Sequence, residues 1–361
     1  MELPVHHLRM HLDGNSSTSS TLYRAMASWA KAKIVRSKIV PALVALVAPE
    51  FLTINALFEL SEAVRAVKKI RNLNGVKVCL TTGFFYNMGG FCLKSPSGSC
   101  SQLTTSSLSK EFSIALGSSR ERRPQPVAPE WLNEIAKVSE DQINDSAGSD
   151  TLTKGIACVQ VIWFVTQVIS RLCQHDSVTL LEVSTTAYVL CAVTSYTAWW
   201  KKPQGCTLPI FIPCEEGALP DASAYMSVIG TWEEFVWGGQ EWFTDDLYYR
   251  YSNWLFAIAL TLAPLVFGAV HIASWNVSLP SAPELWLWRA STLYCSAAGL
   301  ITFLGADNKP GSVATNVSLF VLCSLYVVIR VYMIVEVCIS LRALPRSAYN
   351  SVQWSAFVPH V

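Results

Sequence analysis

The sequence predicts an all-α protein, a polytopic integral membrane helical bundle with about five to six transmembrane helices and two long extramembrane loops. The 361 residues are 51% hydrophobic and only 15% charged, with a mean hydropathy of +0.33, whereas a soluble domain carries about 25% charged residues. Several apolar segments approach the roughly 20 residues that a membrane-spanning helix needs. Tryptophan and tyrosine gather at the ends of these segments, as in the aromatic belts of membrane proteins.

Composition and motifs exclude several other classes of protein. The net charge of +1 provides no field that would hold nucleic acid. The sequence contains no glycine-rich nucleotide fingerprint, no His-Glu-x-x-His and no Gly-x-Ser-x-Gly. We therefore expect no nucleic-acid partner and no cofactor, and the partner that the composition does predict is the lipid bilayer.

The N-terminal region contains one apolar segment that is interrupted by polar residues. Residues 1–38 are expected to be a polar, flexible segment, and 39–60 to be a kinked apolar helix that either spans the membrane or lies at its interface. Pro49 removes a backbone hydrogen bond, and Glu50 would cost about 2.5–3.5 kcal/mol at the bilayer centre. Basic residues on both sides of this helix favour five full spans, with the N-terminus inside and the C-terminus outside.

Five later segments are predicted to span the membrane and to form a bundle over residues 156–341. They cover residues 156–172, 178–200, 254–275, 285–304 and 317–341. The first two are separated by so short a turn that they must form a tight antiparallel hairpin. Outside the spans, 61–155 is expected to be a mixed polar loop region with short helices, 203–246 a second long loop, and 342–361 a C-terminal tail.

A scattered set of residues resembles the pattern of a known family. The matching residues include Ala48-Pro49-Glu50, Met88-Gly89-Gly90-Phe91, Asp145, Asp150, Gln160, Gln167, Arg171, Glu182, Trp199-Trp200-Lys201-Lys202-Pro203, Arg330 and Glu336. Together they resemble a large fungal family of uncharacterised multi-pass membrane proteins. The chain departs from that pattern at Thr82 and Asn87, where family members often carry a histidine and an acidic residue. The resemblance implies a multi-pass membrane location and no particular activity.

Polar residues of the predicted hairpin form the first candidate site. Gln160, Gln167 and Arg171 are spaced by seven and four residues, which places them on one face of a helix. Arg171 ends the first helix and Glu182 begins the second, so the hairpin brings these two side chains to a similar depth. They form either a structural ion pair or a ligand-binding site at the membrane face, in which Glu182 is a candidate catalytic carboxylate.

Charged residues inside the last predicted span form the second candidate site. Arg330 lies near the centre of that span, and Glu336 points to a different face. A central arginine should face a polar cavity or a carboxylate such as Glu50 or Glu182. Arg330, Glu336 and Glu50 are therefore candidate ligand-binding residues, and a structural bridge between helices is the alternative. His271 is either a hydrogen-bonded residue between helices or a second catalytic candidate.

Two aspartates precede the hairpin. Asp145 and Asp150 lie in a polar segment rich in serine and glycine, and paired carboxylates can hold Mg²⁺ together with a diphosphate. The denser aspartate motifs of membrane prenyl-transfer enzymes are not present in the sequence. An exposed acid at Asp145 and a helix cap at Asp150 are the simpler interpretation, so no metal site is predicted.

Three kinds of function remain open. The leading hypothesis is a multi-pass membrane protein with a structural, interaction or sensing role. The first alternative is a membrane-embedded enzyme that acts on a lipophilic isoprenoid or lipid substrate. The second is a transporter of a small anionic solute. A lipophilic small molecule is the ligand that these hypotheses suggest, and the sequence identifies neither a protein partner nor a particular membrane.

The predicted orientation can be tested at two glycosylation sequons, which lie on either side of the predicted span 285–304. They begin at Asn276 and Asn316, and the N-inside orientation places Asn276 outside. In a eukaryotic expression host, Asn276→Gln should abolish the mobility shift that glycosidase treatment causes, and Asn316→Gln should leave the shift unchanged. A glycan on Asn316 would show that the orientation is reversed.

Overall fold

The structure, a computed structural model, describes most of the chain. The described residues are 42–94, 100–103, 130–145, 151–174, 176–203, 209–213, 254–277, 279–306 and 313–350, together with Ile39, Pro96 and Cys206. The chain divides into two units, Met1–Leu46 and Val47–Val361. In the first unit residues 42–46 are helical. The second unit contains every other described helix and strand.

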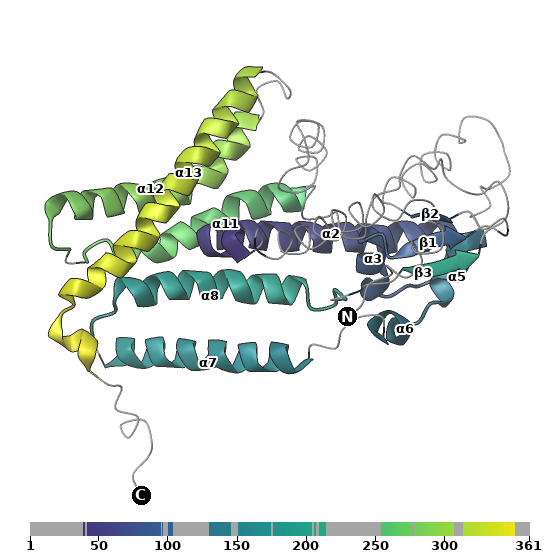
Figure 1. Ribbon diagram of the computed structural model, residues 1–361, viewed down its shortest axis with the longest axis horizontal. Helices are drawn as coiled ribbons and strands as arrows, with labels where there is room; N and C mark the ends of the chain where they lie inside the picture. Colours follow the sequence, from purple (N-terminus) through teal and green to yellow (C-terminus); the bar gives the residue numbers. More distant parts are fainter. Residues whose placement is uncertain are drawn as a thin grey trace, which may run out of the picture. The chain divides into compact units, whose positions relative to one another are not determined.

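The second unit is mostly helical, as the sequence predicts (Figure 1). The helices over the five predicted spans are α7 Thr151–Cys173, α8 Leu180–Ala198, α11 Trp254–Ile272, α12 Ala282–Ala306 and α13 Val313–Ser340. By length and composition, two described helical stretches could cross a membrane, Gly155–Cys173 and Val317–Ala343. α8 and α12 carry serines, threonines and charged residues such as Glu182 and Arg289, and the apolar stretch of α11, Phe256–Ile272, is shorter.

The helix predicted over 39–60 is interrupted at its centre. Ala48 has a non-helical backbone, with φ −142° and ψ 68°, and α2 (Pro49–Asn74) begins directly after it. Proline is favoured at this position because it has no N–H to leave unpaired and its φ already suits a helix. The kink that the sequence indicates is therefore a complete break, at which a new helix starts.

α2 also continues much further than the sequence suggests. It ends at Gly75, whose φ of 69° is a left-handed conformation that glycine adopts readily. The Gly75 N–H donates to the carbonyl oxygen of Arg71 at 2.8 Å and closes the helix end. The region 61–155 was expected to contain loops and short helices, and its first part is instead the second half of a long helix.

A small sheet corrects the all-α prediction. β1 (Phe91–Lys94) is the central strand; it pairs antiparallel with β2 (Cys100–Gln102) and parallel with β3 (Ile210–Pro213). These strands lie in the two segments that were expected to be loops, 61–155 and 203–246. Each strand has only three or four residues, which is too short for an alternating pattern to stand out in the sequence.

The sheet shares a hydrophobic core with three short helices and the second half of α2. The short helices are α3 Leu80–Asn87, α5 Glu130–Lys137 and α6 Glu140–Asp145. The buried residues of this core are Ala66, Ile70, Phe85, Tyr86, Phe91, Leu93, Leu103, Trp131, Leu132, Ile135, Ile143 and Ile212. We call this assembly the peripheral domain. α2 thus belongs to two regions, because its first half packs among the long helices.

Glu140 connects the peripheral domain with the residues that follow α8. Its Oε1 accepts a hydrogen bond from the Thr81 hydroxyl of α3 at 2.8 Å, and Lys201, just after α8, lies 3.1 Å from the same oxygen. The hydrogen bonds from Thr81 and Lys201 hold the pKa of Glu140 below its usual range. α3, α6 and the lysine-rich end of α8 are therefore joined at one carboxylate.

α2 and α8 lie side by side and run in the same direction. The Thr53 hydroxyl, in the second turn of α2, donates to the Cys191 carbonyl oxygen of α8 at 3.2 Å. Further along both helices, the Trp199 indole N–H donates to Glu59 Oε2 at 2.7 Å. α11 packs on α2, α8 and α12, and α13 packs on α12 and α8 (Figure 1).

The long helices expose several large apolar side chains, whereas two charged side chains at their contacts are almost completely buried. Val159 of α7 and Phe320 of α13 are 67% and 73% exposed, whereas Arg330 and Glu50 are 1% and 2% exposed. A soluble protein buries its apolar side chains and almost never buries an unpaired charge completely. In a bilayer the arrangement is reversed, because charges face the bundle interior and apolar side chains face lipid.

Close contact between α11 and α12 depends on two glycines. A Cβ on Gly268 would lie 2.0 Å from Ser296 Oγ, and a Cβ on Gly299 would lie 2.1 Å from the Leu260 carbonyl oxygen. Small residues at such positions let two helix backbones approach closely, as is typical of helix pairs in membranes.

We expect Gly268→Val to destabilise the protein by about 1–3 kcal/mol, because the added side chain forces α11 and α12 apart. Ala269→Val is the matched control, since Ala269 is the exposed neighbour on the same helix. The unfolding midpoint of purified protein should fall for Gly268→Val only. Equal midpoints for both variants would contradict the observed helix contact.

Candidate functional site

A buried arginine connects the long helices at their centre. Arg330 of α13 donates from Nε to the Val47 carbonyl oxygen at 2.7 Å and from an Nη to the Tyr188 hydroxyl of α8 at 3.3 Å. Its guanidinium group also lies 4.0 Å from the centre of the Phe267 ring of α11, within the range of a cation–π interaction. Arg330 thereby links α13 to α8, to α11 and to the chain just before α2.

The Val47 carbonyl is available to Arg330 because the helix is broken at Ala48. In a continuous α-helix this oxygen would accept the N–H of Phe51, four residues later. The Phe51 N–H donates instead to the Ala48 carbonyl oxygen at 3.0 Å. An unpaired carbonyl in apolar surroundings carries a large free-energy penalty, and Arg330 supplies the donor that the break takes away.

A buried acidic side chain, Glu50, accompanies Arg330. It lies in the first turn of α2 and within electrostatic range of Arg330. The N-terminus of a helix also favours an anion. Neither carboxylate oxygen of Glu50 has a hydrogen-bond donor on another described side chain. The sequence predicted that Arg330 faces a polar cavity or a carboxylate such as Glu50 or Glu182. Glu50 is within its electrostatic range, but among the described residues no ion pair joins the two side chains.

His271 lies beside the same arginine but is enclosed by aromatic rings. Its Nδ1 donates to the Phe267 carbonyl oxygen at 2.8 Å, and its ring lies 4.5 Å from the Phe267 ring and 5.9 Å from that of Trp288. It is within electrostatic range of Arg330 and is 1% exposed. We define the Arg330 cluster as the residues Glu50, Tyr188, Phe267, His271 and Arg330.

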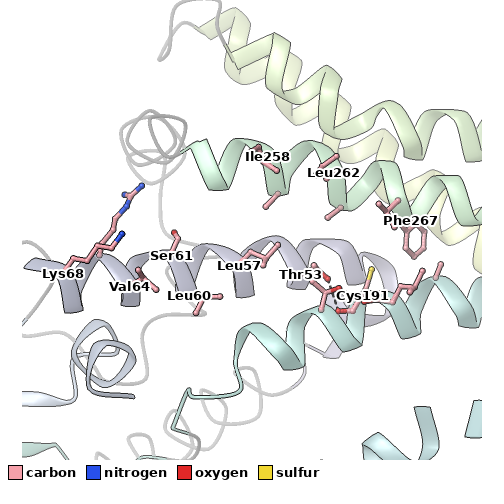
Figure 2. A pocket seen from close by; sticks show the side chains of 17 residues that line it. Thr53, Leu57, Leu60, Ser61, Val64, Lys68, Cys191, Ile258, Leu262 and Phe267 are labelled. Atoms are coloured by element: carbon pink, nitrogen blue, oxygen red, sulfur yellow. Dashed lines mark hydrogen bonds between the residues drawn. The ribbon is translucent and has the colours of Figure 1, made fainter. Parts of the chain in front are cut away.

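An apolar pocket of about 610 Å³ adjoins the Arg330 cluster, between α2, α8 and α11 (Figure 2). Its lining residues are Thr53, Leu57, Leu60, Ser61, Val64, Arg65, Lys68, Ala187, Leu190, Cys191, Thr194, Ile258, Ala259, Leu262, Ala263, Val266 and Phe267. Figure 2 shows Thr53, Cys191 and Phe267 at one end and Lys68 at the other. Phe267 lines the pocket and also contacts the Arg330 guanidinium, so its ring separates the two.

The end of the pocket that lies away from Phe267 is basic. Arg65 and Lys68 both line it, and Lys68 is exposed. The Arg65 guanidinium pairs with Glu62 on the same helix at 2.9 Å. The volume falls within the range of about 300–1,000 Å³ that is usual for small-molecule sites. The pocket is therefore apolar along most of its length and cationic at one end.

The predicted pairing of Arg171 with Glu182 is confirmed. Arg171 Nε lies 3.3 Å from Glu182 Oε1 across the turn between α7 and α8. Glu182 Oε2 accepts the backbone N–H of Thr179 at 2.8 Å and completes a capping box at the start of α8. Arg171 also donates to the carbonyl oxygens of Ser177 and Ala348. Both groups are thus engaged in closing one end of the hairpin.

Glu336 lies apart from Arg330, as their spacing predicts. Its neighbours are Tyr332, Glu284 and Arg342, whereas the contacts of Arg330 come from other helices. Arg342 pairs with Glu284 Oε1 at 2.7 Å. The structure therefore does not bring Glu336 into the Arg330 cluster.

The remaining candidates do not come together in the described structure. Gln160 and Gln167 are exposed on α7, whereas Arg171 is buried at its end, so the three do not form one polar site. Asp145 ends α6, and Asp150 lies outside the described residues. Among the residues that the structure describes, no group of three or more metal-ligating side chains comes together.

The sequence interpretation missed Tyr188 and the pocket. A usable signal was present in α8, where small and polar residues recur at helical spacing. The buried members of this stripe are Leu180, Ser184, Ala187, Cys191, Ser195 and Ala198. A stripe of small residues is a helix-packing surface in membrane proteins, and Tyr188 adjoins it. The position of Lys68 and Arg65 beside α11 depends on the full length of α2, which local patterns do not reveal.

The fold and the site define a mostly helical protein that buries a few charged groups, Arg330 among them, and exposes large apolar side chains on its long helices. The chain belongs to a family of unknown function, DUF8562, whose model matches residues 58–233 and 304–361. No curated protein and no solved structure matched the chain. The matched ranges include most of α2, both helices of the hairpin and all of α13, and the match assigns no activity.

Replacing Arg330 should be among the most damaging changes to this protein. Arg330→Gln removes the donor to Val47, the cation on the Phe267 ring and the positive charge within electrostatic range of Glu50. We therefore expect a loss of about 3–5 kcal/mol of folding free energy. Adding Glu50→Gln to that variant should restore part of the loss. Arg342→Gln, which breaks only an exposed ion pair, should cost at most about 1 kcal/mol.

These unfolding free energies can be measured by denaturant titration in detergent micelles. If Arg330→Gln were as stable as Arg342→Gln, Arg330 would not hold the long helices together. The free-energy cost of Glu50→Gln should also be compared in the native protein and in the Arg330→Gln variant. Equal costs in the two backgrounds would show that Glu50 and Arg330 do not interact.

Proposed function

We propose that this chain is a multi-pass integral membrane protein that binds a lipophilic molecule in the apolar pocket between α2, α8 and α11. The single observation that carries this proposal is the pocket itself, about 610 Å³ in volume and lined mainly by leucine, isoleucine, valine, alanine and phenylalanine. The multi-pass topology and the fungal origin that the sequence resemblance implies form part of the same proposal.

The exposed faces of the helices support a membrane location. Large apolar side chains are exposed on all five long helices, and the charged residues nearest the centre, Glu50 and Arg330, are buried. Exposed apolar patches of this extent mark a surface that meets lipid or another apolar partner. Trp199 and Lys202 at the end of α8 suit the membrane interface, where tryptophan and lysine concentrate.

A lipophilic ligand suits the pocket because several of its walls are also exposed. Leu190 of α8, and Leu262 and Val266 of α11, line the pocket and are each more than two-fifths exposed. The pocket is thus a groove that is open along the sides of helices, and a molecule dissolved in the bilayer can enter it laterally.

The enzyme and transporter alternatives find less support. An enzyme would need a carboxylate or imidazole that a substrate can reach, but Glu182 is engaged in the hairpin turn and His271 is enclosed by Phe267 and Trp288. A transporter of anions would use Arg330. Its guanidinium already contacts Val47 and Tyr188 and stacks on Phe267.

Filling the groove should displace the ligand. Leu190→Trp places a large side chain in the pocket, so the lipophilic molecule that copurifies with the protein should fall several-fold per protein chain. Native mass spectrometry of gently solubilised protein measures this ratio and identifies the released molecule.

Val193→Trp is the matched control for this variant. Val193 lies on the same helix and is 42% exposed, against 43% for Leu190, but it does not line the pocket. Retention of the ligand by Leu190→Trp, or equal loss in both variants, would contradict binding in this pocket.

A further inference from the structure

We infer that the ligand of the apolar pocket is an anionic membrane lipid, whose headgroup lies at Arg65 and Lys68 and whose hydrocarbon chain extends toward Thr53 and Phe267. This inference rests on the proposed function, because it names the class of molecule that the pocket binds. The observation behind it is that the pocket-lining side chains of α2 change from apolar to basic toward the peripheral domain.

The depth of each pocket residue can be read along α2. At 1.5 Å per residue, Thr53 and Lys68 are separated by about 22 Å along the helix axis. The Trp199 indole and the Lys202 ammonium both contact Glu59, and tryptophan and lysine of this kind mark the headgroup level. The Thr53 backbone therefore lies about 9 Å below that level, and the backbones of Arg65 and Lys68 lie about 9 and 14 Å above it. Long basic side chains can extend back along a helix toward the headgroups, and this brings both cations within reach of a lipid headgroup.

This arrangement matches the two parts of a lipid. Leu57, Leu60, Leu190 and Leu262 line the part of the pocket below or near the headgroup level, where a hydrocarbon chain would lie. Arg65 and Lys68 line the part above it. One leaflet of the hydrocarbon core is about 15 Å thick, so a chain that enters from the bilayer can reach the Thr53 end.

The positive charge at the Arg65 and Lys68 end of the pocket favours an anionic headgroup over a zwitterionic one. Glu62 neutralises one charge by pairing with Arg65, and Glu59 is occupied by Lys202 and Trp199. Within the described part of the chain, no acidic side chain forms an ion pair with Lys68. Among the described residues, the Lys68 ammonium thus lacks an acidic partner, and a phosphate or carboxylate headgroup would supply one.

The test compares two pairs of substitutions of equal charge. Protein is reconstituted into nanodiscs of phosphatidylcholine with a minor share of phosphatidic acid, and native mass spectrometry measures the ratio of the two lipids that remain bound. The native protein should be enriched in phosphatidic acid over the bulk composition. Arg65→Gln with Lys68→Gln should lower that enrichment about thirtyfold, since each of the two basic residues contributes about 1 kcal/mol near a headgroup.

Arg71→Gln with Lys77→Gln is the control pair, because both residues are exposed and neither lines the pocket. The inference is overturned if lipid is bound but follows the bulk composition, or if the control pair lowers the enrichment equally. Those outcomes leave the pocket as a lipid site. Lipid retention that is unaffected by Leu190→Trp would instead overturn the proposed function itself.

Discussion

The contact between Arg330 and the Val47 carbonyl oxygen is the interaction on which the rest of this structure depends. The break at Ala48 leaves that oxygen without its helical N–H, and Arg330 is the donor that replaces it. The same guanidinium touches Tyr188 of α8 and Phe267 of α11. Arg330 therefore supplies the missing hydrogen-bond donor at the start of α2 and also contacts the two other helices that form the walls of the pocket.

α2 connects the Arg330 cluster with the peripheral domain. Its first half packs against α8 and α11, and its second half supplies Ala66 and Ile70 to the core around the small sheet. A single helix therefore lines the pocket and also contributes to the core of the peripheral domain. A sensing role is consistent with this connection, since the proposed lipid lies along the same helix.

The sequence predicted the parts of the fold that depend on local pattern. The five helices over the predicted spans, the hairpin and the pairing of Arg171 with Glu182 follow from runs of apolar residues and from spacing across a short turn, although only two of these helices contain a stretch long and apolar enough to cross a membrane. The sequence also indicated that Arg330 needs a buried partner, because a central charge in lipid is costly. It did not show the sheet, since β1 and β3 are short and far apart in the chain, nor the pocket, which requires three helices to be placed together.

The central claim is that the exposed apolar faces meet lipid while the charges lie inside. Spin labels at Val159 of α7 and Val328 of α13, which are 67% and 64% exposed, test it in reconstituted protein. Their relaxation should respond strongly to oxygen, which concentrates in hydrocarbon, and weakly to a water-soluble nickel complex, whereas a label at Lys137 of the peripheral domain should show the opposite. Strong nickel accessibility at Val159 and Val328 would contradict the membrane location and the binding of a lipid in the pocket.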